Sequence, residues 1–165
     1  MGGLVAAQFV ARYASRVDGL VLSSPVLDAG LSPVQKLLLA VLPRWLPNLR
    51  VGNGLQPKYL SHDHEVVRAY LADPLVHDRI TARLTRFIVD GGAAAIAAAP
   101  RWTLPTLLMW AGADRCVAPR GSAAFAAAAP KGVVTSQPWP GFAHEIFNEP
   151  EKAEVIATLV GWLNR

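Results

Sequence analysis

Cysteine, charged residues and long hydrophobic runs are all scarce in this chain of 165 residues. Its single cysteine, Cys116, excludes an internal disulfide and a zinc site built from several cysteines. The apolar runs 37–42 and 104–113 are far shorter than the roughly 20 residues that a membrane-spanning helix needs. The chain also lacks the basic segment, apolar run and cleavage site of a signal peptide, so we expect a cytoplasmic protein.

The remaining composition is that of a folded domain. Hydrophobic residues make up 52% of the chain and charged residues 17%, which excludes global disorder. The net charge of +4 comes mostly from arginines that stand singly among apolar and acidic neighbours. Without a block of like charge or interleaved aromatic residues, we expect no nucleic-acid binding.

Helical and strand patterns alternate at both ends of the chain. The run at 17–26 is apolar on both faces, which is typical of a buried parallel strand, and the strand pattern returns at 105–112. A further strand is predicted at 133–137. Apolar residues at helical spacing, or runs rich in alanine, predict helices over 4–14, 121–129 and 150–163. Such alternation predicts an α/β fold with a parallel sheet.

The middle of the chain differs from both ends in its composition and in its predicted secondary structure. Residues 28–100 are rich in proline, arginine and short helical pieces and show no strand signal, which predicts an all-helical cap inserted into the sheet domain. We therefore divide the chain into a first part of the core (1–27), the cap (28–100) and the carboxyl-terminal part of the core (101–165). In open parallel sheets the chemistry lies at the carboxyl ends of the strands.

Asp114 and His144 follow two of these strand ends. They are 30 residues apart, one strand–helix–strand step, and neighbouring strands lie about 5 Å apart, so we expect the two side chains to meet. A carboxylate that orients an imidazole is two-thirds of a nucleophilic triad. Taken alone, the aspartate is more simply explained as a turn cap and the histidine as a surface or packed residue. Their order and placement together favour catalysis.

Several other residues have competing explanations. The two histidines of the segment 61–65 lack a second ligand cluster, so we expect a polar helix start and no metal. Cys116 lies close to Asp114 and is interpreted as a packed bystander. In the cap, Leu38, Leu42 and Trp45 form either a surface that admits acyl chains or a face that packs the cap onto the body.

A set of short motifs resembles the carboxyl-terminal half of an α/β-hydrolase, most closely the branch of monoacylglycerol lipases, lysophospholipases and S33 peptidases. The matching residues are Met1-Gly2-Gly3 before a helix, Leu22-Ser23-Ser24-Pro25, Asp73-Pro74-Leu75, Gly112-Ala113-Asp114-Arg115, and His144 with Glu149-Pro150. The resemblance implies a partial α/β-hydrolase fold, with the last three parallel strands, flanking helices and a helical cap.

The same resemblance implies acyl transfer to a serine, with His144 as base and acid and Asp114 as its orienter. In that family the serine stands in a G-x-S-M-G-G run, so it would precede Met1, and the Met1 backbone N–H would serve the oxyanion hole only if the chain extends upstream. None of the serines in this sequence lies in a G-x-S-x-G context. We therefore expect the chain as given to be inactive, and a mis-started gene model is favoured over a genuine truncation.

The implied substrates are small esters of medium or long acyl chains, such as monoacylglycerols or lysophospholipids, with no cofactor. The alternative is a non-catalytic remnant, or a module that binds acyl ligands or a partner. Peptidases, haloperoxidases and dehalogenases share the layout and remain open as a third choice. We also expect transient contact of the cap with a lipid interface, and self-association through the open sheet edge.

Overall fold

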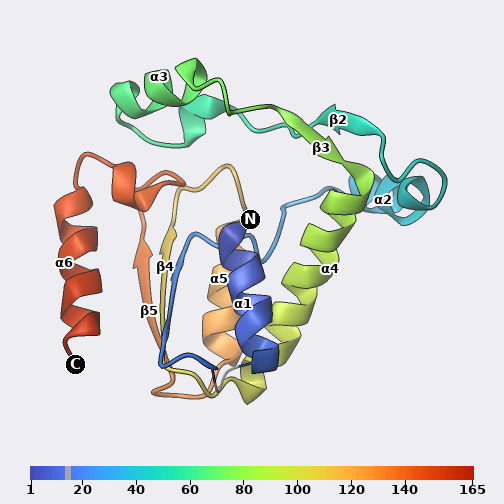
Figure 1. Ribbon diagram of the computed structural model, residues 1–165. Helices are drawn as coiled ribbons and strands as arrows, with labels where there is room; N and C mark the ends of the chain where they lie inside the picture. Colours follow the sequence, from blue (N-terminus) through green and yellow to red (C-terminus); the bar gives the residue numbers. More distant parts are fainter. Residues whose placement is uncertain (14–15) are drawn as a thin grey trace.

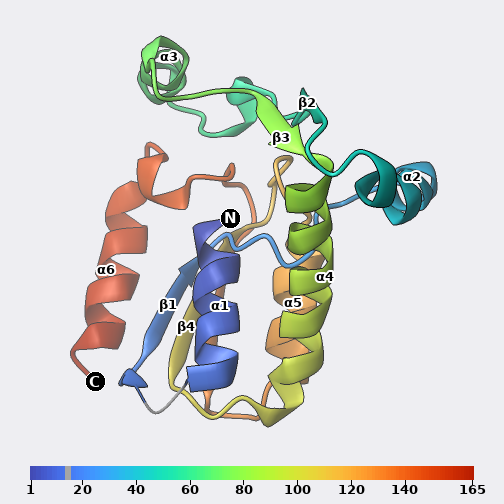
Figure 2. The same cartoon turned by 45° about the vertical axis from the view of Figure 1, so that its right-hand side comes forward.

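The computed structural model describes residues 1–13 and 16–165, in which three parallel strands form the main sheet (Figures 1 and 2). These strands are β1 (Leu20–Ser23), β4 (Thr106–Ala111) and β5 (Val134–Trp139), in the order β1-β4-β5. β1 is shorter than the predicted strand at 17–26, and the other two lie where the sequence predicts them. Because all three run in one direction, their carboxyl ends meet at one edge, above which the loops after β4 and β5 lie side by side.

Helices cover both faces of this sheet. α1 (Gly2–Tyr13), α4 (Ala82–Ala98) and α5 (Pro119–Ala128) lie on one face, and α6 (Lys152–Leu163) lies on the other (Figures 1 and 2). The predicted helices at 121–129 and 150–163 are therefore confirmed within two residues at each end. The helix predicted over 4–14 is also present, although Ala14, its last residue, lies outside the described residues.

The two faces of β4 explain its uninterrupted apolar sequence. Leu108 joins the core beneath α1 and α5, whereas Leu107 and Met109 belong to a second core beneath α6, and all three are fully buried. A central strand with helices on both sides buries every side chain, so apolar residues do not alternate with polar ones. The one polar residue at its start, Thr106, is buried and accepts a hydrogen bond from Trp102 Nε1 at 2.9 Å.

The predicted cap lies across the carboxyl edge of the sheet and is not entirely helical (Figure 2). It contains α2 (Pro33–Trp45), the short 3-10 helix η2 (Pro57–Tyr59) and α3 (His64–Ala72). β2 (Arg50–Gly52) follows α2 and β3 (Arg79–Thr81) follows α3, and the two form an antiparallel pair, so the expectation of no strand in this region is wrong at these two places. Each strand has only three residues, and β2 is wholly exposed, so neither carries the apolar pattern from which a strand is recognised.

α4 connects the cap with the core. Its first turn is capped by Thr81, whose hydroxyl accepts a hydrogen bond from Leu84 N at 3.2 Å, next to the β2–β3 pair. At its other end, Ala95 and the following Ala99 are buried in the core with α1. The 3-10 helix η3 (Ala99–Arg101) then leads into β4. One helix therefore serves both regions, and the division at residue 100 remains a prediction.

Within the described ranges, no helix combines the length and the apolarity that crossing a bilayer requires.

Candidate active site

The loops that follow β4 and β5 are held together by their backbones. Gly112 N donates to Trp139 O at 2.7 Å, and Ala113 N donates to Phe142 O at 3.2 Å. These bonds continue the parallel ladder beyond the strands, so the residues that follow in each loop are brought to the same place.

Asp114 and His144 meet above this junction. His144 Nδ1 lies 2.7 Å from Asp114 Oδ2, and the two side chains are 23% and 2% exposed. The other carboxylate oxygen of Asp114 accepts hydrogen bonds from Cys116 N at 2.7 Å and Val117 N at 3.0 Å. The predicted contact is confirmed, and the simpler explanation of Asp114 as a turn cap is also correct, because one oxygen caps the turn while the other holds the imidazole.

This arrangement prepares the imidazole for proton transfer. A carboxylate that accepts from Nδ1–H leaves the lone pair on Nε2, which can then take a proton from a nucleophile. The turn bonds at Asp114 Oδ1 keep the carboxylate from rotating away. The catalytic roles of the two residues remain predictions, whereas their geometry is that of a base and its orienter.

The amino-terminal end of α1 faces the same edge of the sheet (Figures 1 and 2). Met1 O accepts hydrogen bonds from Leu4 N at 3.0 Å and Val5 N at 3.3 Å, so Met1 lies at the start of the helix. Gly3 lies so close to Pro25 that a Cβ would be 3.0 Å from the proline Cβ. The oxyanion role of the Met1 N–H remains a prediction.

Cys116 lies beside the pair as a half-buried thiol. Its Sγ donates to Tyr59 O at 3.5 Å, and burial, aided by the charges of Asp114 and Glu145, raises the pKa of the Cys116 thiol to about 12. Ligand atoms of Asp114, Cys116 and His144 lie within 4.8 Å of one another, the spacing of a metal site. The Asp114 carboxylate already accepts three hydrogen bonds, from Cys116 N, Val117 N and His144 Nδ1.

The cap residues that we expected to contact substrate lie on α2. Leu38 and Trp45 are 55% and 78% exposed, and Leu42 is half-buried. α2 packs against α4 at the end of the cap opposite α3 (Figure 2). The structure therefore places these three residues on a largely exposed helix and records no contact between them and the Asp114–His144 pair.

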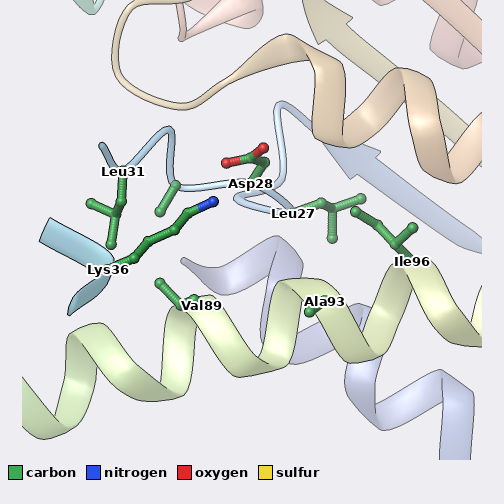
Figure 3. A pocket seen from close by; sticks show the side chains of 8 residues that line it. Leu27, Asp28, Leu31, Lys36, Val89, Ala93 and Ile96 are labelled. Atoms are coloured by element: carbon green, nitrogen blue, oxygen red, sulfur yellow. The ribbon is translucent and has the colours of Figure 1, made fainter. Parts of the chain in front are cut away.

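A shallow cavity of about 180 Å³ lies where the loop after β1 passes over α4 (Figure 3). Its walls are mainly apolar, and Lys36 and Asp28 bring opposite charges to it. The hydrogen bond from Arg120 lowers the pKa of Asp28, which keeps this carboxylate charged. The cavity is separate from the Asp114–His144 pair, since neither residue lines it.

Sequence reasoning missed a second histidine–carboxylate pair. The segment 61–65 does start a cap helix as predicted, with the Asp63 side chain accepting from Glu65 N at 2.9 Å. His62, however, lies just before the N-cap of that helix, and its Nδ1 lies 2.6 Å from Oε2 of Glu149, which is 1% exposed. The two residues are 87 positions apart, so no local pattern in the sequence connects them.

Comparison with known proteins assigns the chain to a family. A family model described as serine aminopeptidase, S33 matches residues 1–151. Over 99% of its length, the chain is 34% identical to a monoacylglycerol lipase of Mycolicibacterium smegmatis, of which it spans 59%. It is also 30% identical to a phospholipase of Bacillus subtilis, over 94% of the chain and 62% of that protein. The chain therefore spans less than two thirds of the length of these curated relatives.

Two crystal structures have the same fold as this chain. A monoacylglycerol lipase of Paleococcus ferrophilus superposes with a TM-score of 0.90 at 34% identity, over 98% of this chain and 64% of that one. A variant of the monoglyceride lipase of Saccharomyces cerevisiae, in complex with a substrate analogue, has a TM-score of 0.83 at 20% identity, over 98% and 58% of the two chains. The predicted partial α/β-hydrolase fold and the resemblance to monoacylglycerol lipases are thus confirmed. With the family model covering most of the sequence, the chain belongs to the serine aminopeptidase S33 family of α/β-hydrolases.

Proposed function

We propose that this chain is the carboxyl-terminal part of a carboxylic-ester hydrolase that acts on monoacylglycerols or lysophospholipids. The hydrogen bond between His144 Nδ1 and Asp114 Oδ2 carries the proposal, because it supplies the base and orienter that acyl transfer to a serine requires. The names of the relatives support the substrate class, since they include a monoacylglycerol lipase and a phospholipase.

In the proposed reaction, His144 Nε2 removes the proton of a serine hydroxyl as that oxygen attacks the ester carbonyl. The Asp114 carboxylate stabilises the imidazolium that forms, and His144 then protonates the leaving alcohol. In the second half of the cycle, His144 takes a proton from water, which attacks the acyl-enzyme and releases the fatty acid. The residues of this chain supply the proton transfers, and the serine belongs to the G-x-S segment that we place ahead of Met1 in the longer protein.

The oxyanion hole of the proposed enzyme includes the backbone N–H of Met1. Met1 directly precedes α1, and the first N–H groups of a helix have no partners within the helix. Their partial positive charge is suited to stabilising the oxygen anion of a tetrahedral intermediate.

The cap of the proposed enzyme meets the acyl chain or the lipid surface that presents it. α2 exposes several large apolar side chains along its length, namely Val34, Leu37, Leu38, Val41 and Trp45. An apolar helix face in contact with water favours transfer to a lipid interface by about 25 cal/mol for each Å² that it buries. We therefore keep Leu38, Leu42 and Trp45 as the proposed contacts with acyl groups.

The open edge of the sheet is the proposed site of self-association. β1 pairs only with β4 among the described strands, and the neighbouring α1 exposes Met1, Val5, Phe9 and Tyr13, which are four residues apart along one helix face. An unpaired strand edge beside an apolar helix face invites pairing with another chain. Light scattering should show oligomers of the 165-residue chain and a monomer once an upstream strand covers this edge.

The hydrolase proposal is tested with p-nitrophenyl esters. We expect no burst and no turnover from the 165-residue chain, and both from the chain extended upstream through the G-x-S segment. Activity of the extended protein should disappear in the His144→Ala variant. Turnover by the short chain that disappears with His144→Ala would show that the nucleophile lies within it. An inactive extended protein that still binds fatty acid would favour the acyl-binding alternative.

A further inference from the structure

A short segment of the cap lies directly on the loop that carries His144. We call residues 59–62, from the last residue of η2 to the residue before the N-cap of α3, the clasp. Tyr59 O accepts a hydrogen bond from His144 N at 3.4 Å, and Leu60 O accepts one from Glu145 N at 2.8 Å. The backbone of the catalytic loop therefore bonds to the cap at the histidine itself.

The other end of the clasp is anchored to the end of the same loop. The Ser61 hydroxyl donates to Asn148 O at 2.7 Å. Glu149 accepts from both the backbone and the ring of His62, at 2.9 Å to Oε1 and 2.6 Å to Oε2. The loop from His144 through the 3-10 helix η4 (Ile146–Asn148) to Glu149 is thus held at its beginning and at its end by four consecutive residues.

Glu149 is an unusual anchor because it is a buried carboxylate. It is 1% exposed, whereas the ring of His62 is 61% exposed. Both carboxylate oxygens are paired with His62. A buried charge without partners is strongly unfavourable, so the loop and the clasp are most stable when they lie together.

The clasp also contacts the loop that carries Asp114. Tyr59 O, which accepts from His144 N, also accepts from Cys116 Sγ at 3.5 Å. The guanidinium of Arg115 lies 4.3 Å from the centre of the Tyr59 ring, in the geometry of a cation–π interaction. One cap residue therefore touches both catalytic loops.

We propose that Glu149 and His62 are positioning residues, which hold the His144 loop against the clasp so that the imidazole stays in register with Asp114. The proposal rests on the proposed hydrolase function. Neither residue touches the reacting atoms, and their effect passes through the backbone bonds at His144 and Glu145. The proposal also gives the cap a second role, because the cap segment that lies on the His144 loop also aligns the imidazole of His144.

The first test compares turnover in the extended protein for Glu149→Ala, Glu149→Gln and His62→Ala, with His64→Ala as the matched control on an exposed neighbour in α3. For Glu149→Ala and His62→Ala we expect kcat to fall about ten- to hundredfold, the effect of misplacing a catalytic group by about 1 Å, with KM within about twofold. Glutamine can keep both hydrogen bonds to a neutral His62, so Glu149→Gln should stay within about threefold of the parent.

A second readout does not depend on catalysis. Amide hydrogen exchange at His144 and Glu145 should quicken about tenfold or more in Glu149→Ala, while exchange at Leu107 and Leu108 in the central strand stays unchanged. An inactive parent protein would refute the proposed function and leave this measurement to decide the role of the clasp.

Three results would overturn the proposal. The first is an unchanged kcat in both Glu149→Ala and His62→Ala. The second is a Glu149→Gln variant as slow as Glu149→Ala, which would show that the hydrogen bonds are not what matters. The third is equal acceleration of amide exchange at His144 and at Leu108. That result would show that Glu149 stabilises the whole fold and does not specifically hold the His144 loop.

Discussion

Gly112 lies against the backbone of Pro140, so that a Cβ at residue 112 would be 2.6 Å from Pro140 Cα and 2.8 Å from Pro140 O. Heavy atoms do not approach so closely, and the proline backbone has little freedom to move away. This contact lies where the loops after β4 and β5 cross. It therefore sets the separation of the loops from which Asp114 and His144 project.

Gly112→Ala should destabilise the protein by about 1–3 kcal/mol, the usual cost of forcing an extra group into a packed site. Urea unfolding followed by circular dichroism measures the change. The matched control is Gly141→Ala, next to Pro140 in the loop after β5, where a Cβ meets nothing within 4 Å and should change stability by about 0.5 kcal/mol or less. Equal effects of the two substitutions would show that the close approach to Pro140 is not what requires glycine.

Two adjacent glycines of α4 should respond oppositely to alanine. At Gly92 the new Cβ would collide with the backbone carbonyl of Leu27, whereas at Gly91 it would meet the flexible end of Gln8. Alanine gains up to about 1 kcal/mol over glycine within a helix, so Gly91→Ala should be neutral or stabilising. Gly92→Ala should lose about 1–3 kcal/mol through the collision. Thermal unfolding of the two variants side by side checks the difference, and a stabilised Gly92→Ala would refute the packing argument.

Asp114→Asn in the extended protein should lower kcat far more than it weakens binding. An asparagine favours the wrong tautomer of the imidazole, and the same substitution in serine proteases costs about 10⁴ in turnover. Steady-state kinetics with an ester substrate would separate kcat from KM. Asp73→Asn, at the exposed end of α3, is the control and should change neither. A rate that is unchanged in Asp114→Asn would remove this residue from the catalytic set.

The Cys116 thiol should resist alkylation in the folded protein. Because burial raises its pKa to about 12, the reactive thiolate at pH 8 is scarcer by a factor of roughly 10³ than in an exposed cysteine. Iodoacetamide should therefore modify the native chain at least about a hundredfold more slowly than the chain unfolded in urea. The protein has one cysteine, so a mass shift reports this site alone. Equal rates in the two states would show that the thiol is neither buried nor neutral.

The amino-acid sequence by itself determined the order of strands and helices on either side of the cap, and the loops that carry Asp114 and His144. Apolar runs without alternation mark strands that are covered on both faces, and parallel strands bring their carboxyl ends to one edge. The strand pattern alone therefore predicts that the two residues lie close together. The 2.7 Å contact between them follows from this topology.

Only the tertiary structure decided the features that depend on distant segments meeting. The exposed three-residue strands β2 and β3 carry no apolar pattern of their own, and the pair exists because the chain folds back at this point. Likewise, nothing local to His62 predicts that it pairs with Glu149, 87 residues away. Local patterns reflect burial on one face of an element, whereas the partner of a buried carboxylate and the space beside a glycine depend on which backbones pack together.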